Sequence, residues 1–152
     1  MRLDKLDLNI LGLLQANAKT SYATIGDQVD LSVSAVNERI KKPQAKGVIN
    51  GYTAVVNPAA IGLGICGFVQ VLISDPSVEE GFLRAVEALD EVQECHTITG
   101  DFSYLLKIRA RDAKSFEQFL RERIKILPGV LRSHSLIALT TSKETSRIPL
   151  PG

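Results

Sequence analysis

The chain has 152 residues, of which 45% are hydrophobic and 23% are charged, and its formal net charge is +1. This length suits one domain or two small ones, and the near-neutral charge gives no general attraction to nucleic acid. No apolar run approaches the roughly 20 residues of a membrane span and no signal peptide is evident, so we expect a cytoplasmic protein. The two cysteines, Cys66 and Cys95, lack metal-ligand spacing and fit a reducing compartment, although a disulfide between them stays open.

Three helices are predicted in about the first 45 residues. The first spans about 4–17, and its predicted apolar face consists of Leu3, Leu6, Ile10, Leu13 and Leu14. A short helix follows, with Ile25 and Val29 one turn apart, and a tight turn at 30–32 leads into a third helix. We expect a compact bundle in which the first helix covers the back of the other two.

The third helix carries the pattern that bears on function. Ser32 is its predicted N-cap, and Val33, Val36 and Ile40 recur at helical spacing and predict a buried face. The outward stripe consists of Ser34, Asn37, Glu38, Lys41 and Lys42, with Arg39 at its edge. Small polar and amide side chains near a helix start suit base edges, and cations further along suit phosphates. The pattern predicts a recognition helix for the DNA major groove; the alternative is an ordinary amphipathic surface helix.

An extended segment at 48–56 follows, as either a wing or a connecting strand, and a turn at 57–60 closes the first unit. We therefore predict a helix-turn-helix DNA-binding domain with a connecting strand over residues 1–58. Asn57 and Pro58, which favour a turn, mark the end of this domain.

Strands and helices alternate over residues 63–141. Strands are predicted at 64–74, 92–100, 102–110 and about 130–141. One helix begins at a capping box of Ser77 and Glu80, and a second begins at Asp112 and stops at Pro128-Gly129. The order β-α-β-β-α-β is that of a ferredoxin-like domain, whose sheet has two helices on one face. Phe68, Leu72 and their bulky neighbours predict a partner subunit on the other face, and 142–152 is a tail that is ordered only if it docks.

Candidates for catalysis or metal binding are weak. His96 and His134 have no second ligand at useful spacing, and no nucleophile–base set or phosphate-cradling loop is present in the sequence. We expect no enzyme, no metal site and no cofactor.

Taken in order, five segments resemble the Lrp/AsnC family of bacterial and archaeal transcription regulators. They are residues 3–26, 31–42, 47–58, 98–110 and 127–139. The resemblance implies an α+β protein, with a winged-type helix-turn-helix domain joined to a ferredoxin-like effector-binding and oligomerisation domain. It also implies a homodimer, assembling further to a tetramer or octamer, that binds double-stranded DNA and senses an amino acid or related metabolite.

The candidate site residues fall into two groups. The DNA-binding group is Ser32, Ser34, Asn37, Glu38, Arg39, Lys41, Lys42 and Lys46. The effector group is implied by the resemblance and is the turn formed by Thr99, Gly100, Asp101, Phe102, Ser103 and Tyr104. Gly100 allows close backbone approach, and Asp101 can accept from an ammonium group; the alternative is a plain β-turn.

Two positions depart from the family pattern. Pro43 stands where a leucine is usual, and because proline lacks an amide donor we expect the recognition helix to end or bend at Lys42. Ser103 stands where the pattern has an acid, which removes one negative charge from the effector turn. Two rival functions stay open: a metabolite-binding oligomer that binds DNA weakly because of Pro43, and a nucleoid-organising protein with little sequence preference.

Overall fold

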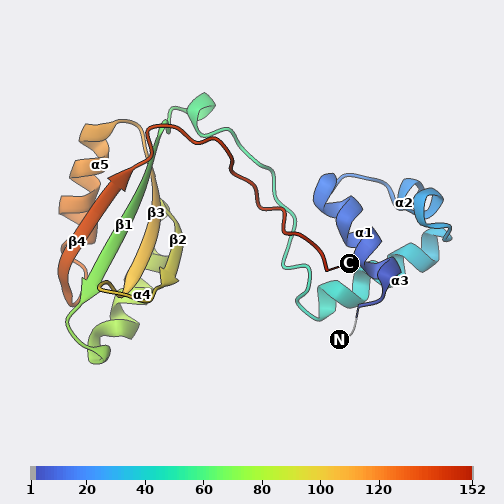
Figure 1. Cartoon of the computed structure of the whole chain (residues 1–152), viewed down its shortest axis with the longest axis horizontal. Helices are drawn as coiled ribbons and strands as arrows, with labels where there is room; N and C mark the ends of the chain where they lie inside the picture. The colour runs from blue at the N-terminus through green and yellow to red at the C-terminus, as the bar shows by residue number, and fades with distance from the viewer. Residues whose placement is uncertain (1–2, 152) are drawn as a thin grey trace. The chain divides into compact units, whose positions relative to one another are not determined.

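The computed structural model describes residues 3–151 and contains two compact units (Figure 1). One unit runs to Val55 and also includes the chain from Lys143, and the other spans Val56–Ser142. The predicted boundary at residue 58 lies just beyond this division. The segment that we expected to form a separate tail is thus part of the first unit. No helix in the described part of the chain is long and apolar enough to cross a membrane.

The first unit is a bundle of three helices, α1 (Lys5–Ala16), α2 (Tyr22–Val29) and α3 (Val33–Ala45). Each begins at a side chain that accepts from the helix's first turn, because the first amides of a helix have no partner within it. Asp4 and Asp7 form a capping box on α1, and the hydroxyls of Ser21 and Ser32 cap α2 and α3. The core consists of Ile10, Leu14, Ile25, Val36 and Ile40.

The turn between α2 and α3 is tight because of two backbone features. Asp30 adopts a left-handed conformation (φ 55°, ψ 51°) that ends α2, and the Leu31 amide donates to the Gly26 carbonyl at 3.0 Å. A Cβ on Gly26 would lie 2.4 Å from the Leu31 carbonyl oxygen, so only glycine fits below the turn. This close approach fixes the angle at which α3 leaves α2.

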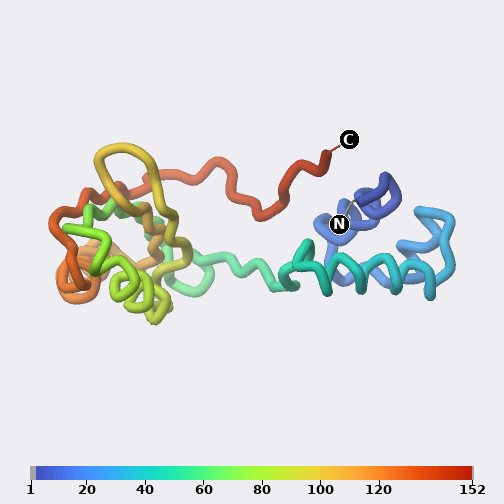
Figure 2. The backbone as a smooth tube through the Cα atoms, turned by 90° about the horizontal axis from the view of Figure 1, so that it is seen from below, coloured from blue at the N-terminus to red at the C-terminus, as the bar shows by residue number. Residues whose placement is uncertain are grey.

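The expectation that α3 ends at Lys42 is wrong. The helix continues to Ala45 with Pro43 buried on the inner side, and Figure 2 follows it in cyan as the longest helix of the first unit. The Lys46 amide donates to the Lys42 carbonyl at 3.1 Å, so helical hydrogen bonding resumes past the proline. Gly47 (φ 68°) then ends the helix in a Schellman motif, in which the Val48 amide donates to the Pro43 carbonyl at 2.8 Å.

A second expectation for α3 also fails. Val33 was predicted on the buried face, but it is 53% exposed, whereas Val36 and Ile40 are fully buried. Val33 is the first helical residue, and the buried face is completed at the other end of the helix by Pro43. The residues after Gly47 are extended without strand pairing, so the described chain forms no wing hairpin.

The C-terminal segment docks on α1. The Gln15 side chain makes two hydrogen bonds with the backbone of Ile148, donating to its carbonyl at 3.1 Å and accepting from its amide at 2.9 Å. The Leu150 side chain lies over Gly12, where a Cβ would meet its Cδ1 in ordinary van der Waals contact at 3.7 Å. Two separate stretches of chain, one before Val56 and one after Ser142, therefore link the units covalently.

The second unit is a four-stranded antiparallel sheet with two helices on one face (Figure 1). Its strands are β1 (Ile65–Ile73), β2 (Val92–Thr97), β3 (Tyr104–Ala110) and β4 (Val130–Ile137), in the order β2-β3-β1-β4. Helix α4 (Glu79–Glu87) follows a 3₁₀ turn at Pro76–Val78, and α5 (Ala113–Phe119) continues as a π-helix over Leu120–Ile124. The predicted ferredoxin-like arrangement is confirmed.

The inner face of the sheet forms the main core. Val69, Val71, Tyr104, Leu106 and Ile108 alternate along β1 and β3 and are fully buried against the helices. Alternate residues of β3 therefore face the core, as the two-residue period of a strand requires. The predicted capping box of Ser77 and Glu80 is wrong: Asp75 is the cap and accepts from the Ser77 amide at 2.7 Å, because Pro76 starts the turn two residues earlier than expected.

The other face of the sheet, which we call the open face, is not covered by any helix. Register pairs Phe68 with Leu136, Gln70 with His134 and Leu72 with Arg132 on this face. Leu105, Lys107, Glu94 and His96 continue it across β3 and β2. Leu136 is 49% exposed, so a row of apolar side chains is left uncovered at the centre of a polar surround.

Candidate DNA-binding helix and effector turn

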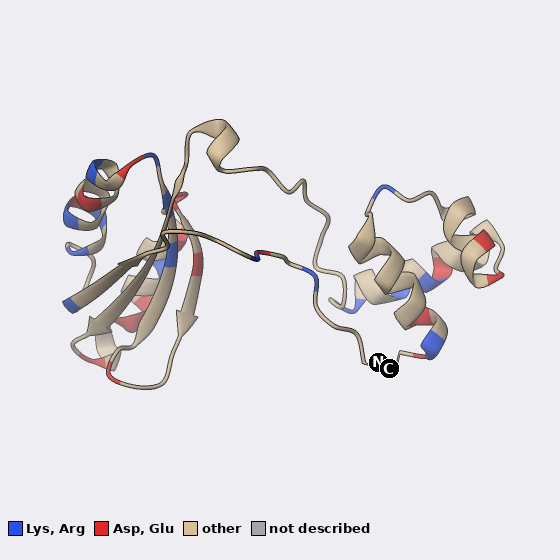
Figure 3. Ribbon diagram, turned by 45° about the horizontal axis from the view of Figure 1, so that its top comes forward, with Lys and Arg blue, Asp and Glu red and all other residues tan. Residues whose placement is uncertain are grey.

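The outer side of α3 presents most of the predicted DNA-binding residues to solvent. Ser32, Ser34, Glu38, Lys41, Lys42 and Lys46 are exposed, and Asn37 and Arg39 are half-buried. In the ribbon of Figure 3, the lysine and arginine positions along this helix are blue. The Ser32 hydroxyl accepts from the Ala35 amide at 3.2 Å and lies 3.0 Å from the Ser34 hydroxyl. The start of the helix thus presents small polar groups, its second half presents Lys41 and Lys42, and Lys46 follows as the C-cap.

Arg39 is engaged within the domain. Its guanidinium donates to Asp4 at 2.8 Å and to Asp7 at 2.7 Å, so it connects α3 to the capping box of α1. The hydrogen bond from Arg39 holds the pKa of the Asp4 carboxyl below its ordinary value. Arg39 therefore occupies a position on the edge of the outward stripe while holding two helices together.

Val33 is a surface residue that sequence reasoning missed. It follows the Ser32 cap directly and exposes half of its side chain next to Ser34. An apolar side chain at this place suits the methyl group of thymine. The sequence did carry a signal for this exposure, because Val33 directly follows the N-cap. The first residue of a helix lies at its end, and the buried face is formed by the later turns.

The predicted effector turn joins β2 to β3 and projects from the sheet, as the yellow loop in Figure 2 shows. Thr99, Gly100 and Asp101 are exposed, Phe102 and Ser103 are half-buried, and Gly100 has a φ of 106°. Within the described residues, no hydrogen bond engages the amides of Gly100, Asp101 or Phe102. The turn therefore presents a row of available donors.

Two residues of the predicted effector group hold the turn in place. The Ser103 amide donates to the Val71 carbonyl at 2.9 Å, and its hydroxyl accepts from the Ile73 amide at 3.3 Å. Tyr104 is buried on the inner face and donates to the Glu79 carboxylate of α4. Burial, together with that hydrogen bond, raises the pKa of Tyr104 to about 12. The structure thus brings 99–102 together at the surface, whereas the Tyr104 side chain lies on the opposite side of the sheet.

Phe102 reaches over the end of β1 to the outer strand. Its ring lies 4.8 Å from the Arg132 guanidinium carbon and 6.4 Å, centroid to centroid, from the His134 ring. Sequence reasoning did not assign Arg132 or His134 to the turn, because they are some 30 residues away and only the strand order places them beside it.

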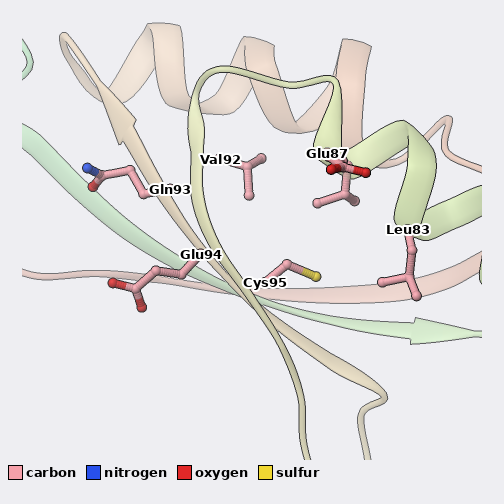
Figure 4. Close-up of a pocket in the computed structure, with 7 residues that line it drawn as sticks. Leu83, Glu87, Val92, Gln93, Glu94 and Cys95 are labelled. Carbon is pink, nitrogen blue, oxygen red and sulfur yellow. The ribbon is translucent and has the colours of Figure 1, made fainter. Parts of the chain in front are cut away.

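A separate cavity lies on the helix-covered side of the sheet (Figure 4). It has a volume of about 310 Å³ between α4 and the edge strand β2, and it is lined by Leu83, Val86, Glu87, Val92, Gln93, Glu94 and Cys95. Burial raises the pKa of the Cys95 thiol, so this thiol is a poor nucleophile. Both cysteines are free, and the part of the chain that the structure describes contains no cluster of three metal-ligating side chains.

Comparison with known proteins gives the same two-part division. The AsnC-type helix-turn-helix domain matches residues 3–42, and the Lrp/AsnC ligand binding domain matches residues 66–148. The chain is 36% identical over 148 residues to the leucine-responsive regulatory protein of Escherichia coli K12. The aligned residues cover 96% of this chain and 90% of that protein.

Solved structures agree in fold over nearly the whole chain. A transcriptional regulator from Neisseria meningitidis in complex with L-methionine has a TM-score of 0.92 and 30% identity, covering 97% of both chains. A feast or famine regulatory protein from M. tuberculosis complexed with L-methionine has a TM-score of 0.91 and 32% identity, covering 99% of this chain and 100% of that one. The protein therefore belongs to the Lrp/AsnC family: it is a DNA-binding transcription regulator and not an enzyme.

Proposed function

We propose that the protein regulates transcription by binding specific DNA sites through α3 and by responding to an amino acid at the 99–104 turn. The observation that supports DNA reading most directly is the outward stripe of α3, in which polar side chains at the helix start precede three exposed lysines. The helix continues through Pro43 to Ala45, which supports DNA reading over the rival function in which Pro43 disables the recognition helix.

Within this stripe we assign two roles. Ser34, Asn37 and Glu38, with Val33 beside them, contact base edges, because they lie in the first half of the helix. Lys41, Lys42 and Lys46 contact phosphates, because their charges are exposed and flexible. Arg39 acts indirectly: its two ion pairs with α1 hold the recognition helix in position.

The open face supports a homodimer. An uncovered apolar row at the centre of a sheet is stabilised when a second copy covers it, because that removes apolar area from water. Two-fold pairing of this kind demands a partly palindromic DNA site, with half-sites one helical turn apart or multiples of it (roughly 34–36 Å per turn). A tetramer or octamer of such dimers, acting in the cytoplasm where the DNA lies, is the assembly that we expect.

The amino acid response is supported by the turn's available amides and by two similar proteins whose structures contain L-methionine. Backbone amides can bind a carboxylate, and Asp101 can accept from an ammonium group. Coupling between such a ligand and DNA binding is typically worth about 1–3 kcal/mol.

The test is recovery of genomic DNA fragments by the purified full-length protein, with and without a pool of free amino acids. We expect a few loci that share a pseudo-palindrome, and a change in recovery when the pool is present. Recovery of fragments from all parts of the genome, with no locus enriched, would instead identify a nucleoid-organising protein.

Three variants test the division of roles on the recovered site. Asn37→Ala should reduce discrimination against mismatched sites by about 1–3 kcal/mol, and Lys41→Ala should weaken all sequences alike and lower the salt slope by about 1. Arg39→Ala should lower the stability of the first unit and leave the salt slope unchanged. Equal and uniform losses in Asn37→Ala and Lys41→Ala would show that the assignment is wrong.

A further inference from the structure

A three-residue cluster on the open face lies beside the effector turn. It consists of Phe102 from the turn and of Arg132 and His134 from β4, which follow each other on the same side of that strand. The Arg132 guanidinium lies over the Phe102 ring at 4.8 Å, within the range of a cation–π contact. The turn and the outer strand are thereby held together across the end of β1.

Arg132 has no acidic partner. Across residues 3–151, no carboxylate lies within 4.0 Å of its guanidinium, and this includes the exposed Asp101 of the neighbouring turn. Other arginines of this unit are differently placed: Arg84 and Arg121 pair with glutamates one helical turn away. Arg132 thus keeps a full charge that no group of the described chain neutralises.

The contact places the Arg132 guanidinium over the face of the Phe102 ring and limits where this group can lie. Its N–H donors lie in the plane of the guanidinium. Two parallel donors of this kind match the two oxygens of a carboxylate, and a charged pair is stronger than a neutral hydrogen bond. Because the contact with Phe102 limits where the guanidinium can lie, less rotamer freedom is lost when an anion binds.

We propose that Arg132 binds the carboxylate of the amino acid effector, with Phe102 as the platform that orients it. The inference rests on the proposed effector turn and names the residue outside it that recognises the ligand's anionic end. The free amides of the turn can donate to the same carboxylate, and Asp101 can accept from the ammonium group. The Ser103 hydroxyl accepts from the Ile73 amide at the end of β1, which holds the turn on the sheet.

The test uses full-length protein and isothermal titration with the twenty standard L-amino acids. The amino acid that binds most tightly is then compared with its amino alcohol, which has the same side chain and ammonium group but no carboxylate. The variants are Arg132→Gln and Arg132→Lys, with Arg123→Gln as a control because Arg123 is an exposed arginine on the helix-covered side of the same unit. Thermal unfolding of each variant checks that the fold is kept.

We expect Arg132→Gln to weaken binding of the amino acid roughly tenfold or more, and to leave binding of the amino alcohol unchanged. Arg132→Lys should fall between, since it keeps the charge and loses the paired donors. The role of Arg132 would be overturned if Arg132→Gln bound the amino acid with unchanged affinity, or if it lost equal affinity for the amino acid and the amino alcohol. Either result would leave the proposed amino acid response standing. A wild-type protein that binds none of the twenty amino acids would overturn the proposed response itself.

Discussion

Replacing Pro43 tests how a proline is accommodated inside a recognition helix. Pro43 lies in the last turn of α3, where it lacks the amide that would donate to the Arg39 carbonyl and its ring crowds that carbonyl. In a helix interior this costs roughly 3 kcal/mol. The cost here is smaller, about 1–2 kcal/mol, because the Pro43 carbonyl stays bonded to the Val48 amide at 2.8 Å and the helix ends two residues later.

Pro43→Ala restores the amide without adding volume, and Pro43→Leu also extends the buried face of Val36 and Ile40. Hydrogen exchange by mass spectrometry on full-length protein measures the opening free energy of residues 33–47. We expect exchange to slow about 5–30-fold in Pro43→Ala, and at least as much in Pro43→Leu. Equal exchange in the wild type and both variants would refute the reasoning, since the proline would then cost the helix nothing.

Three further changes test the packing of the two units. Gly26→Ala should destabilise the first unit by about 1–3 kcal/mol in chemical denaturation, because the added Cβ would lie 2.4 Å from the Leu31 carbonyl oxygen. Gly51→Ala is the control and should show no loss of stability, because a Cβ there meets no atom within 4 Å. Gln15→Ala should release the docked C-terminal segment, seen as faster exchange of residues 145–150 with the rest of α1 unchanged. The raised pKa of Tyr104 means that the unfolded chain loses this proton first, so unfolding free energy should fall by about 1.4 kcal/mol per pH unit between pH 10 and 12. Tyr104→Phe should remove that part of the pH dependence, and a profile identical to the wild type would show that the Glu79 contact does not hold the phenol neutral.

Local signals predicted the secondary structure well. Ser32 as a cap, the helical spacing of Val36 and Ile40, and the alternation of Tyr104, Leu106 and Ile108 each reflect interactions within a few residues, so the sequence alone indicates them. The predictions that failed did so because another group close by in the sequence took over the expected role. Asp75 displaced Ser77 as a cap, and Pro43 was tolerated because its carbonyl, unlike its missing amide, still has partners.

By itself, the sequence determined the two-part organisation, the outward stripe of α3 and the position of the turn at 99–104, because periodicity and capping are properties of neighbouring residues. Only the tertiary structure decided that Arg39 pairs with Asp4 and Asp7, that the Tyr104 phenol donates to Glu79, and that the C-terminal segment docks on α1. It alone brought Arg132 and Phe102 together. These contacts join residues 25 or more positions apart, and their partners depend on strand order and helix packing, which no local pattern encodes.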